Sequence, residues 1–148
     1  MLFDTFCIFA EAIDQLKDGR MVIHGGYTHM MLEDIDPNAN KLVIGLWVRL
    51  FEKPSSDSKV EIEIHAPGED VYVDTLEIQI SDELEEVVGE QRPLVAFRTF
   101  TRSEYVPVEE GDFAVYVSVD GEKKFSGAMF VGFSSSGLKL DEEEKIEE

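Results

Sequence analysis

The alternation of hydrophobic and polar residues predicts a chain built from β-strands. Every second residue from Phe113 to Val119 is Phe or Val, and Asp120-Gly121 follows directly. A period of two places one apolar set on one face of a strand, and an Asp-Gly pair supplies the positive φ angles of a tight turn. A second apolar run, from Phe125 to Phe133, then returns. The C-terminal part is therefore predicted to be a β-hairpin.

Two further strands are predicted in the middle of the chain. Every second residue from Leu42 to Leu50 is aliphatic, and the other face of this segment carries Trp47 and Phe51 and is also largely apolar. We expect this strand to be covered on both sides, or its second face to meet a partner. Segment 59–65 alternates more cleanly, with apolar residues inward and charged residues outward, which predicts a strand with one solvated face.

The remaining strands are predicted with less regular patterns, over 2–9, 20–24 with a continuation over 27–32, 71–80 and 94–102. Gly25-Gly26 predicts a bulge or a sharp bend. The apolar positions within 71–80 change parity, which predicts a bulge near Asp74-Thr75.

Two segments leave helical alternatives open. Residues 10–19 fit a short amphipathic helix ended by Gly19, or an irregular hairpin connection closed by Asp18-Gly19. Within 81–93, Asp82 and Glu85 would form a capping box for one helical turn at about 82–88.

Since no helices alternate with the strands, a parallel α/β sheet is excluded. The pattern predicts an all-β fold, an antiparallel β-sandwich of about eight strands with at most one or two short helices, and a small barrel is the second choice. We expect one such domain over residues 1–137, ending in a Ser-Gly linker, and an acidic tail over 138–148.

The chain is strongly acidic, with 32 Asp and Glu against 13 Lys and Arg and a net charge of −19. The end segment 141–148 holds six acids and one Lys and contributes −5, so the other 140 residues carry −14. A surface this negative repels phosphate backbones, which excludes direct nucleic-acid binding and favours a basic partner.

The sequence predicts a cytoplasmic protein without disulfides. The one cysteine, Cys7, lies in an apolar run and is expected to be a buried, inert thiol. Acidic residues interrupt the first apolar run, so no signal peptide is expected, and no segment approaches the roughly 20 apolar residues of a membrane span.

No motif for catalysis, metal binding or cofactor binding is present. His24, His29 and His65 form no metal-binding motif, and Asp34-x-Asp36-x-Asn38 resembles the start of a calcium loop but has Ala39 where Gly is required. We therefore expect no enzymatic activity, no metal and no cofactor.

Several features follow one another in a recognisable order. They are Cys7 in a first strand, Gly19-Arg20, Gly25-Gly26, the strands Leu42–Phe51 and Val60–Ile64, and the hairpin from Pro107 through Gly111-Asp112-Phe113 to Asp120-Gly121. In this order they resemble a family of small uncharacterised bacterial proteins. The resemblance covers most of residues 3–132 and implies a β-sandwich-like fold with no established activity and no catalytic residue. Segment 81–93 and the acidic tail depart from it.

We expect a non-enzymatic protein–protein interaction module. Its predicted contact residues are Trp47, Phe51, Tyr116, Glu61 and Glu63. The partner would be another protein within a larger assembly, one with a basic surface, or a second copy in a homo-oligomer.

An acidic nucleic-acid mimic is the alternative function. Such a protein would inhibit a nucleic-acid-binding enzyme, as phage anti-defence proteins do, and its acids would have to form a stripe. The acids that could form it are Glu61, Glu63, Glu69, Asp70, Glu83, Glu85 and Glu86.

Overall fold

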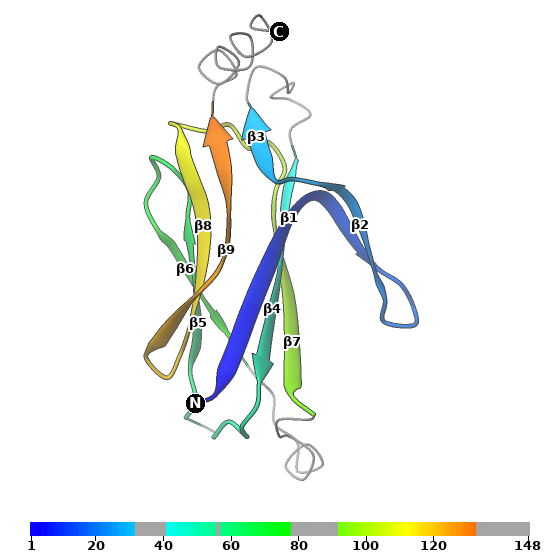
Figure 1. Ribbon diagram of the computed structural model, residues 1–148, viewed down its shortest axis with the longest axis vertical. Helices are drawn as coiled ribbons and strands as arrows, with labels where there is room; N and C mark the ends of the chain where they lie inside the picture. Colours follow the sequence, from blue (N-terminus) through cyan, green and yellow to red (C-terminus); the bar gives the residue numbers. More distant parts are fainter. Residues whose placement is uncertain (32–40, 56, 78–91, 133–148) are drawn as a thin grey trace, which may run out of the picture.

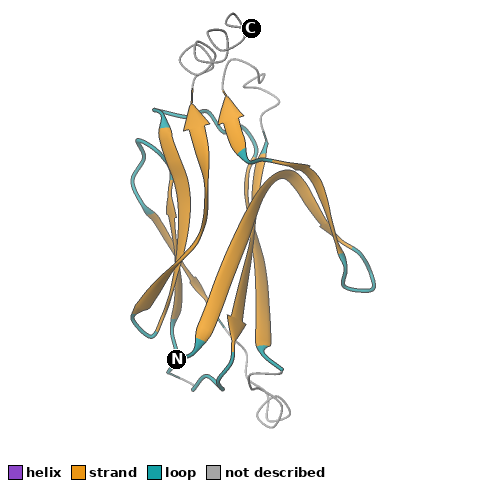
Figure 2. Cartoon of the chain, viewed as in Figure 1, coloured by secondary structure: helices purple, strands orange, loops and turns teal. Residues whose placement is uncertain are grey.

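The computed structural model describes residues 1–31, 41–55, 57–77 and 92–132. Over these residues the chain forms nine β-strands and no helix (Figures 1 and 2). In chain order they are β1 (Phe3–Gln15), β2 (Met21–Gly26), β3 (His29–Met31), β4 (Leu42–Leu50), β5 (Val60–His65), β6 (Tyr72–Leu76), β7 (Leu94–Arg102), β8 (Gly111–Val119) and β9 (Glu122–Gly132). The all-β prediction is confirmed.

The strands form two sheets that face each other (Figure 1). The four-stranded sheet has the order β2-β1-β4-β7, and the five-stranded sheet has the order β3-β9-β8-β5-β6. Within the described ranges, all pairings are antiparallel except that of β3 with β9, which is parallel. The arrangement is the predicted two-layer sandwich.

The core lies between the sheets and follows the predicted alternation. The five aliphatic side chains at alternate positions from Leu42 to Leu50 are each at most 1% exposed. Across from them, the alternate side chains of β8 from Phe113 to Val119 are also at most 1% exposed. Burial of this apolar area supplies most of the driving force for bringing the two sheets together.

Residues 10–19 are not helical. β1 continues to Gln15 and pairs with β2 in an unbroken register as far as Gln15↔Met21. Gly19 adopts a φ of 92° and closes the connection by donating its N–H to the Leu16 carbonyl at 3.0 Å. The hairpin alternative is therefore confirmed. An isolated helix of about ten residues is marginal in water, whereas the ladder to β2 satisfies the backbone groups.

The Gly25-Gly26 pair makes a bend and not a bulge. The β1–β2 register runs to Ala10↔Gly26 without a shift, and Gly25 has a φ of 62°. Directly afterwards, the Tyr27 N–H donates to the Phe9 carbonyl at 2.7 Å, and the chain crosses to the other sheet. The prediction that 27–32 continues the preceding strand is wrong, because β3 pairs with β9 instead.

The predicted bulge near Asp74-Thr75 is absent. β5 and β6 pair without a register shift along the whole of β6. The positions of β6 that share the inward parity are Tyr72, Asp74 and Leu76, and Asp74 forms an ion pair with Arg98 of β7. Asp74 is charged although it occupies an inward position, so the apolar residues of this strand do not alternate regularly. In the sequence this irregularity resembled a shift of the strand register. The predicted turn at 82–88, Ile78, Ile80, the linker and the acidic tail lie outside the described residues.

A bulge does occur between β8 and β9. The register changes between Val115↔Gly127 and Tyr116↔Phe125, which leaves Ser126 as the extra residue. Ser126 is only 9% exposed and its hydroxyl lies 3.0 Å from the Thr5 hydroxyl of β1. Bulges redirect side chains, and this one directs Ser126 towards the opposite sheet.

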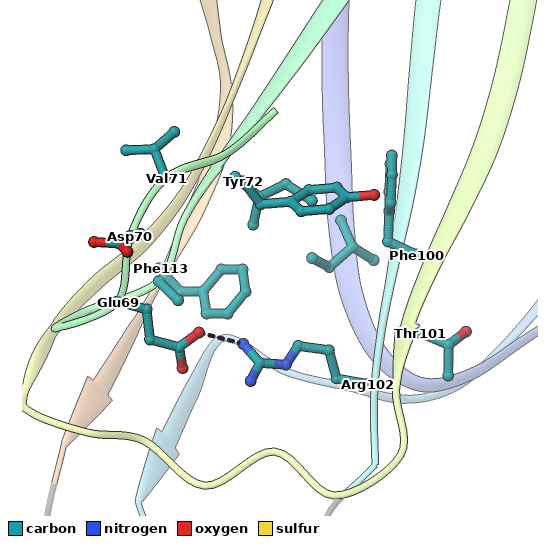
Figure 3. A pocket seen from close by; sticks show the side chains of 11 residues that line it. Glu69, Asp70, Val71, Tyr72, Phe100, Thr101, Arg102 and Phe113 are labelled. Carbon is teal, nitrogen blue, oxygen red and sulfur yellow. Dashed lines mark hydrogen bonds and ion pairs between the residues drawn. The ribbon is translucent and has the colours of Figure 1, made fainter. Parts of the chain in front are cut away.

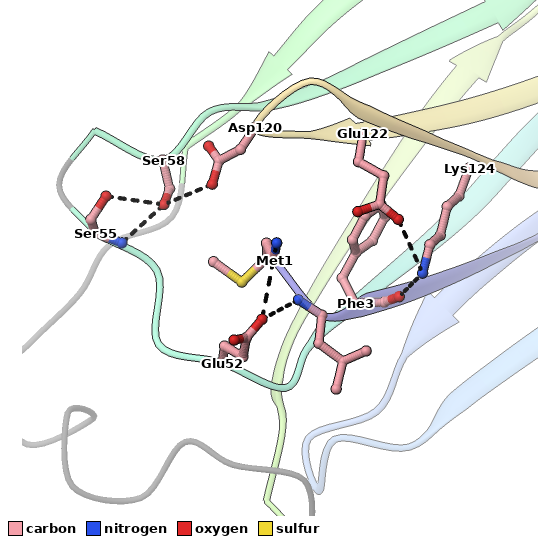
Figure 4. Close-up of polar contacts among 9 residues, drawn as sticks. Met1, Phe3, Glu52, Ser55, Ser58, Asp120, Glu122 and Lys124 are labelled. Carbon is pink, nitrogen blue, oxygen red and sulfur yellow. Dashed lines mark hydrogen bonds and ion pairs between the residues drawn. The ribbon is translucent and has the colours of Figure 1, made fainter.

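The turn between β8 and β9 is the predicted two-residue turn. Asp120 and Gly121 both have positive φ angles, of 51° and 89°. The Asp120 carboxylate accepts a hydrogen bond from the Ser58 hydroxyl at 3.4 Å (Figure 4). It accepts another from the Lys59 amide at 2.9 Å. These bonds fix the turn against the segment that precedes β5.

Candidate protein-binding surfaces

The outer face of the four-stranded sheet carries three aromatic side chains in one line, which we call the aromatic row. Trp47 of β4 pairs in register with Phe6 of β1 on one side and with Phe97 of β7 on the other. The rings of Phe6 and Trp47 are stacked with centroids 4.8 Å apart and planes at 8°, and those of Trp47 and Phe97 are 4.5 Å apart. Each ring therefore holds its neighbour in place.

One flank of the aromatic row is electrically neutral. Arg49 donates to the Asp4 carboxylate from Nε, at 2.8 Å, and from Nη2. This hydrogen bonding raises the pKa of Arg49, so the guanidinium stays charged. Val95, the next residue in register beyond Arg49, is 51% exposed, and Phe6 is 45% exposed. The surface is apolar and partly exposed on a chain whose net charge is −19.

The opposite flank is closed by Ile13. Gly45 of β4 has no side chain, and Ile13 Cδ1 lies 2.7 Å from where a Cβ on Gly45 would stand. The Phe97 and Trp47 rings both lie 3.4 Å from that same point. A Cβ on Gly45 would shift the end of the Ile13 side chain, so the glycine leaves room for Ile13 at the end of the aromatic row.

The outer face of the five-stranded sheet carries a different group, the tyrosine cluster, centred on Tyr116. The ring of Tyr116 lies 5.0 Å from the His65 ring and 5.6 Å from the Phe125 ring, and Lys123 Nζ lies 4.9 Å from its centroid. Glu63 accepts hydrogen bonds from Lys123 at 2.9 Å and from His65 at 3.0 Å. Aromatic and charged groups are thus interleaved on this face.

The electrostatics of the tyrosine cluster favour ionised Glu63. The hydrogen bonds from Lys123 and then from His65 lower its pKa below the ordinary value of 4.5. Beside it on β5, Glu61 lies 3.4 Å from Lys59.

The structure does not bring the five predicted contact residues together. Trp47 lies in the aromatic row, whereas Tyr116, Glu61 and Glu63 lie on the outer face of the other sheet. Phe51 lies just beyond β4 and is half-buried, with the Arg49 guanidinium 5.5 Å from its ring centroid.

Sequence reasoning missed Phe6 and Phe97. The available signal was the alternation of faces along the strand. Phe6 is an even-numbered residue, as is the charged residue Asp4, so both lie on the face opposite to core residue Phe3.

Three of the four described acids of the predicted stripe have basic neighbours, and the fourth, Asp70, is exposed. Glu61, Glu63 and Glu69 lie 3.4, 2.9 and 2.9 Å from Lys59, Lys123 and Arg102, respectively. Glu83, Glu85 and Glu86 lie outside the described residues. Three of the acids are therefore offset by cations, which weakens the negative field a basic groove would meet.

A pocket of about 610 Å³ opens between the two sheets, at the edge where β6 and β7 face each other (Figure 3). Glu69, in the turn between β5 and β6, accepts a hydrogen bond from Arg102 of β7 at 2.9 Å. The Arg102 guanidinium also lies 4.7 Å from the ring centroid of Tyr105. Burial, followed by the charge of Glu69, raises the pKa of Tyr105 to about 12.

Other reactive groups are few in the described ranges. No three His, Cys, Asp or Glu side chains gather there in a way that could hold a metal ion. Burial raises the pKa of the Cys7 thiol to about 11, so the thiol is protonated at neutral pH and is a poor nucleophile. None of the described segments is a helix long and apolar enough to cross a membrane.

Comparison of the chain with protein-family models, with curated proteins and with solved structures finds no match. The resemblance to small bacterial proteins therefore stays a prediction.

Proposed function

We propose that this protein is a non-enzymatic interaction module that binds another protein through the aromatic row. The observation that carries the proposal is the stacked Phe6–Trp47–Phe97 line on an outer sheet face. Exposed contiguous apolar surface on an otherwise highly charged protein marks interaction sites. Aromatic residues, Trp above all, are enriched among the residues that dominate binding energy.

The aromatic row suits this role better than the tyrosine cluster. Glu63 and Lys123 in the tyrosine cluster already satisfy each other, and their desolvation would oppose binding. In the aromatic row, the rings are held by one another and by the sheet, so few rotamers are lost when a partner docks. A partner with an apolar contact surface fits this face.

A matched pair of substitutions tests the proposal. Val95 and Val73 are 51% and 54% exposed, and they lie on the outer faces of opposite sheets. Val95→Glu adds a charge beside the aromatic row without removing packing, and Val73→Glu makes the same change beside Glu63. Full-length wild type and both variants would be used to capture proteins from a lysate of the native host at low and high salt, and their masses would be measured by light scattering.

We expect the wild type and Val73→Glu to retain a partner at high salt. Val95→Glu is expected to weaken the affinity for that partner about tenfold or more, since a carboxylate covered by an apolar partner surface loses its hydration. A wild-type dimer that Val95→Glu alone converts to monomer would identify the partner as a second copy. Loss of the partner in Val73→Glu alone would assign binding to the outer face of the five-stranded sheet. A nucleic-acid-binding partner released by salt from all three proteins would favour the acidic-mimic alternative.

A further inference from the structure

We propose that the pocket between the sheets binds a small apolar molecule that carries one uncharged polar group, such as a primary amide or a hydroxyl. This site is separate from the aromatic row, which lies on the outer face of the four-stranded sheet. Protein interiors hold few voids larger than a water molecule, and sites for small molecules typically span about 300–1,000 Å³. At about 610 Å³, this pocket is of ligand size.

The inner walls of the pocket are apolar. Ile44 and Phe113 are at most 1% exposed, and Ile64 and Ala66 are each 8% exposed, so these core side chains form a preformed surface. Phe100 completes the wall on the β7 side. An apolar body placed against these residues would be removed from water, which is the main favourable term in such binding.

Side-chain contacts between β7 and the β6 side hold the pocket open at a fixed width. Arg98 pairs with Asp74, and the Tyr72 and Phe100 rings meet edge to face with centroids 6.3 Å apart. Tyr72 lies across the pocket towards Phe100, and it is 53% exposed (Figure 3). This aromatic ring at the pocket rim gives an entering molecule a first apolar contact.

The Glu69–Arg102 pair determines which polar group a ligand in the pocket can carry. A single hydrogen bond of 2.9 Å joins the two side chains. A guanidinium has five N–H donors and a carboxylate has about four acceptor sites, so both residues keep capacity for a further partner. A neutral amide can accept from Arg102 and donate to Glu69 without breaking their bond.

Anionic ligands are disfavoured at the same place. A carboxylate would compete with Glu69 for Arg102, and it would add negative charge beside Asp70. Like charges at such distances in partly buried sites are costly.

The test uses octanamide and octanoate as matched probes on the full-length protein with ¹³C-labelled isoleucine methyl groups. Octanamide is expected to shift the methyl signals of Ile44 and Ile64 in a saturable manner, whereas Ile8, Ile13 and Ile23, away from the pocket, stay unchanged. Octanoate is expected to bind about tenfold more weakly or worse. Absence of shifts at Ile44 and Ile64, equal shifts at all five of the isoleucines named above, or tighter binding of octanoate would each overturn the proposal.

Two variants locate the site independently. Ala66→Phe fills the pocket and is expected to weaken octanamide binding by about tenfold or more. Ala128→Phe makes the same change at an exposed position of β9 and is expected to leave binding unchanged. Unchanged affinity in a folded Ala66→Phe protein would contradict the assignment, and if this variant does not fold, the wild-type methyl map decides alone.

Discussion

Two hydroxyl groups connect the sheets, and their coupling can be measured. The Thr5 hydroxyl donates its only hydrogen to the Trp47 carbonyl at 2.8 Å. The Ser126 hydroxyl, 3.0 Å away, must therefore donate to Thr5 Oγ1. Ser126 also hydrogen bonds with Cys7. Removing Thr5 Oγ1 thus breaks two bonds, one within the four-stranded sheet and one across to β9.

The magnitudes follow from the number of bonds. A hydrogen bond contributes about 0.5–1.5 kcal/mol net, so Thr5→Val is expected to lower the free energy of unfolding by about 1–3 kcal/mol, and Ser126→Ala by a similar amount. Each single variant breaks the Thr5–Ser126 bond. The double variant should therefore cost less than the sum of the two, by about 0.5–1.5 kcal/mol.

Urea unfolding of the four proteins measures this double-mutant cycle, with the slope m checked for constancy. Thr99→Val is the matched control, because Thr99 is exposed on β7. It is expected to change stability by no more than about 0.5 kcal/mol. Costs for Thr5→Val and Ser126→Ala that add within about 0.3 kcal/mol would refute the bond between the sheets.

Three further changes test other contacts. Gly127→Ala places a Cβ 2.7 Å from Cys7 Sγ and is expected to cost about 1–3 kcal/mol in thermal unfolding; failure of an added Cys7→Ala to recover part of this loss would contradict the steric reason. Glu63 has a lowered pKa, so its stabilisation is present above its ordinary pKa of 4.5 and is lost as the pH falls through the folded-state value. The difference in unfolding free energy between wild type and Glu63→Gln should shrink in that window, and a difference that stays constant down to pH about 3 would argue against the ion pair with Lys123. Ile62→Ala, at a position 0% exposed, should cost about 2–5 kcal/mol by urea unfolding, and a cost under about 1 kcal/mol would be incompatible with its burial.

Strands whose inward positions are all apolar could be located from the sequence. In β4, β5 and β8, the period-two pattern and the burial agree at every inward residue, each of which is at most 8% exposed. The Asp-Gly turn after β8 was equally predictable, because few residue pairs adopt two consecutive positive φ angles.

The edges of the sheets could not be predicted in the same way. β6 and β7 place Asp74, Arg98 and Arg102 at inward positions, where they form ion pairs across the gap between the sheets. Inward-pointing charges are a known means of protecting edge strands from pairing with other chains. From the sequence alone such residues look like outward positions, so the pattern suggested a bulge where the strand is regular.

The β1–β2 connection was undetermined for a similar reason. Residues 10–19 suit a helix and a hairpin about equally by local preference, and the pairing with β2 decides between them. That pairing depends on contacts that local periodicity does not report.

The candidate surface shows most clearly what parity can and cannot establish. Trp47 and Tyr116 were grouped because both occupy the non-core parity of their strands, and both do lie on outer faces. Parity separates inside from outside, but it does not tell which of the two sheets a strand joins. In a sandwich the two outer faces point in opposite directions, so one partner surface cannot cover both residues. Phe6 and Phe97 join Trp47 only because the register of three strands aligns them. A binding surface on this fold must therefore be confined to one sheet, and the contrast between Val95 and Val73 separates the two faces.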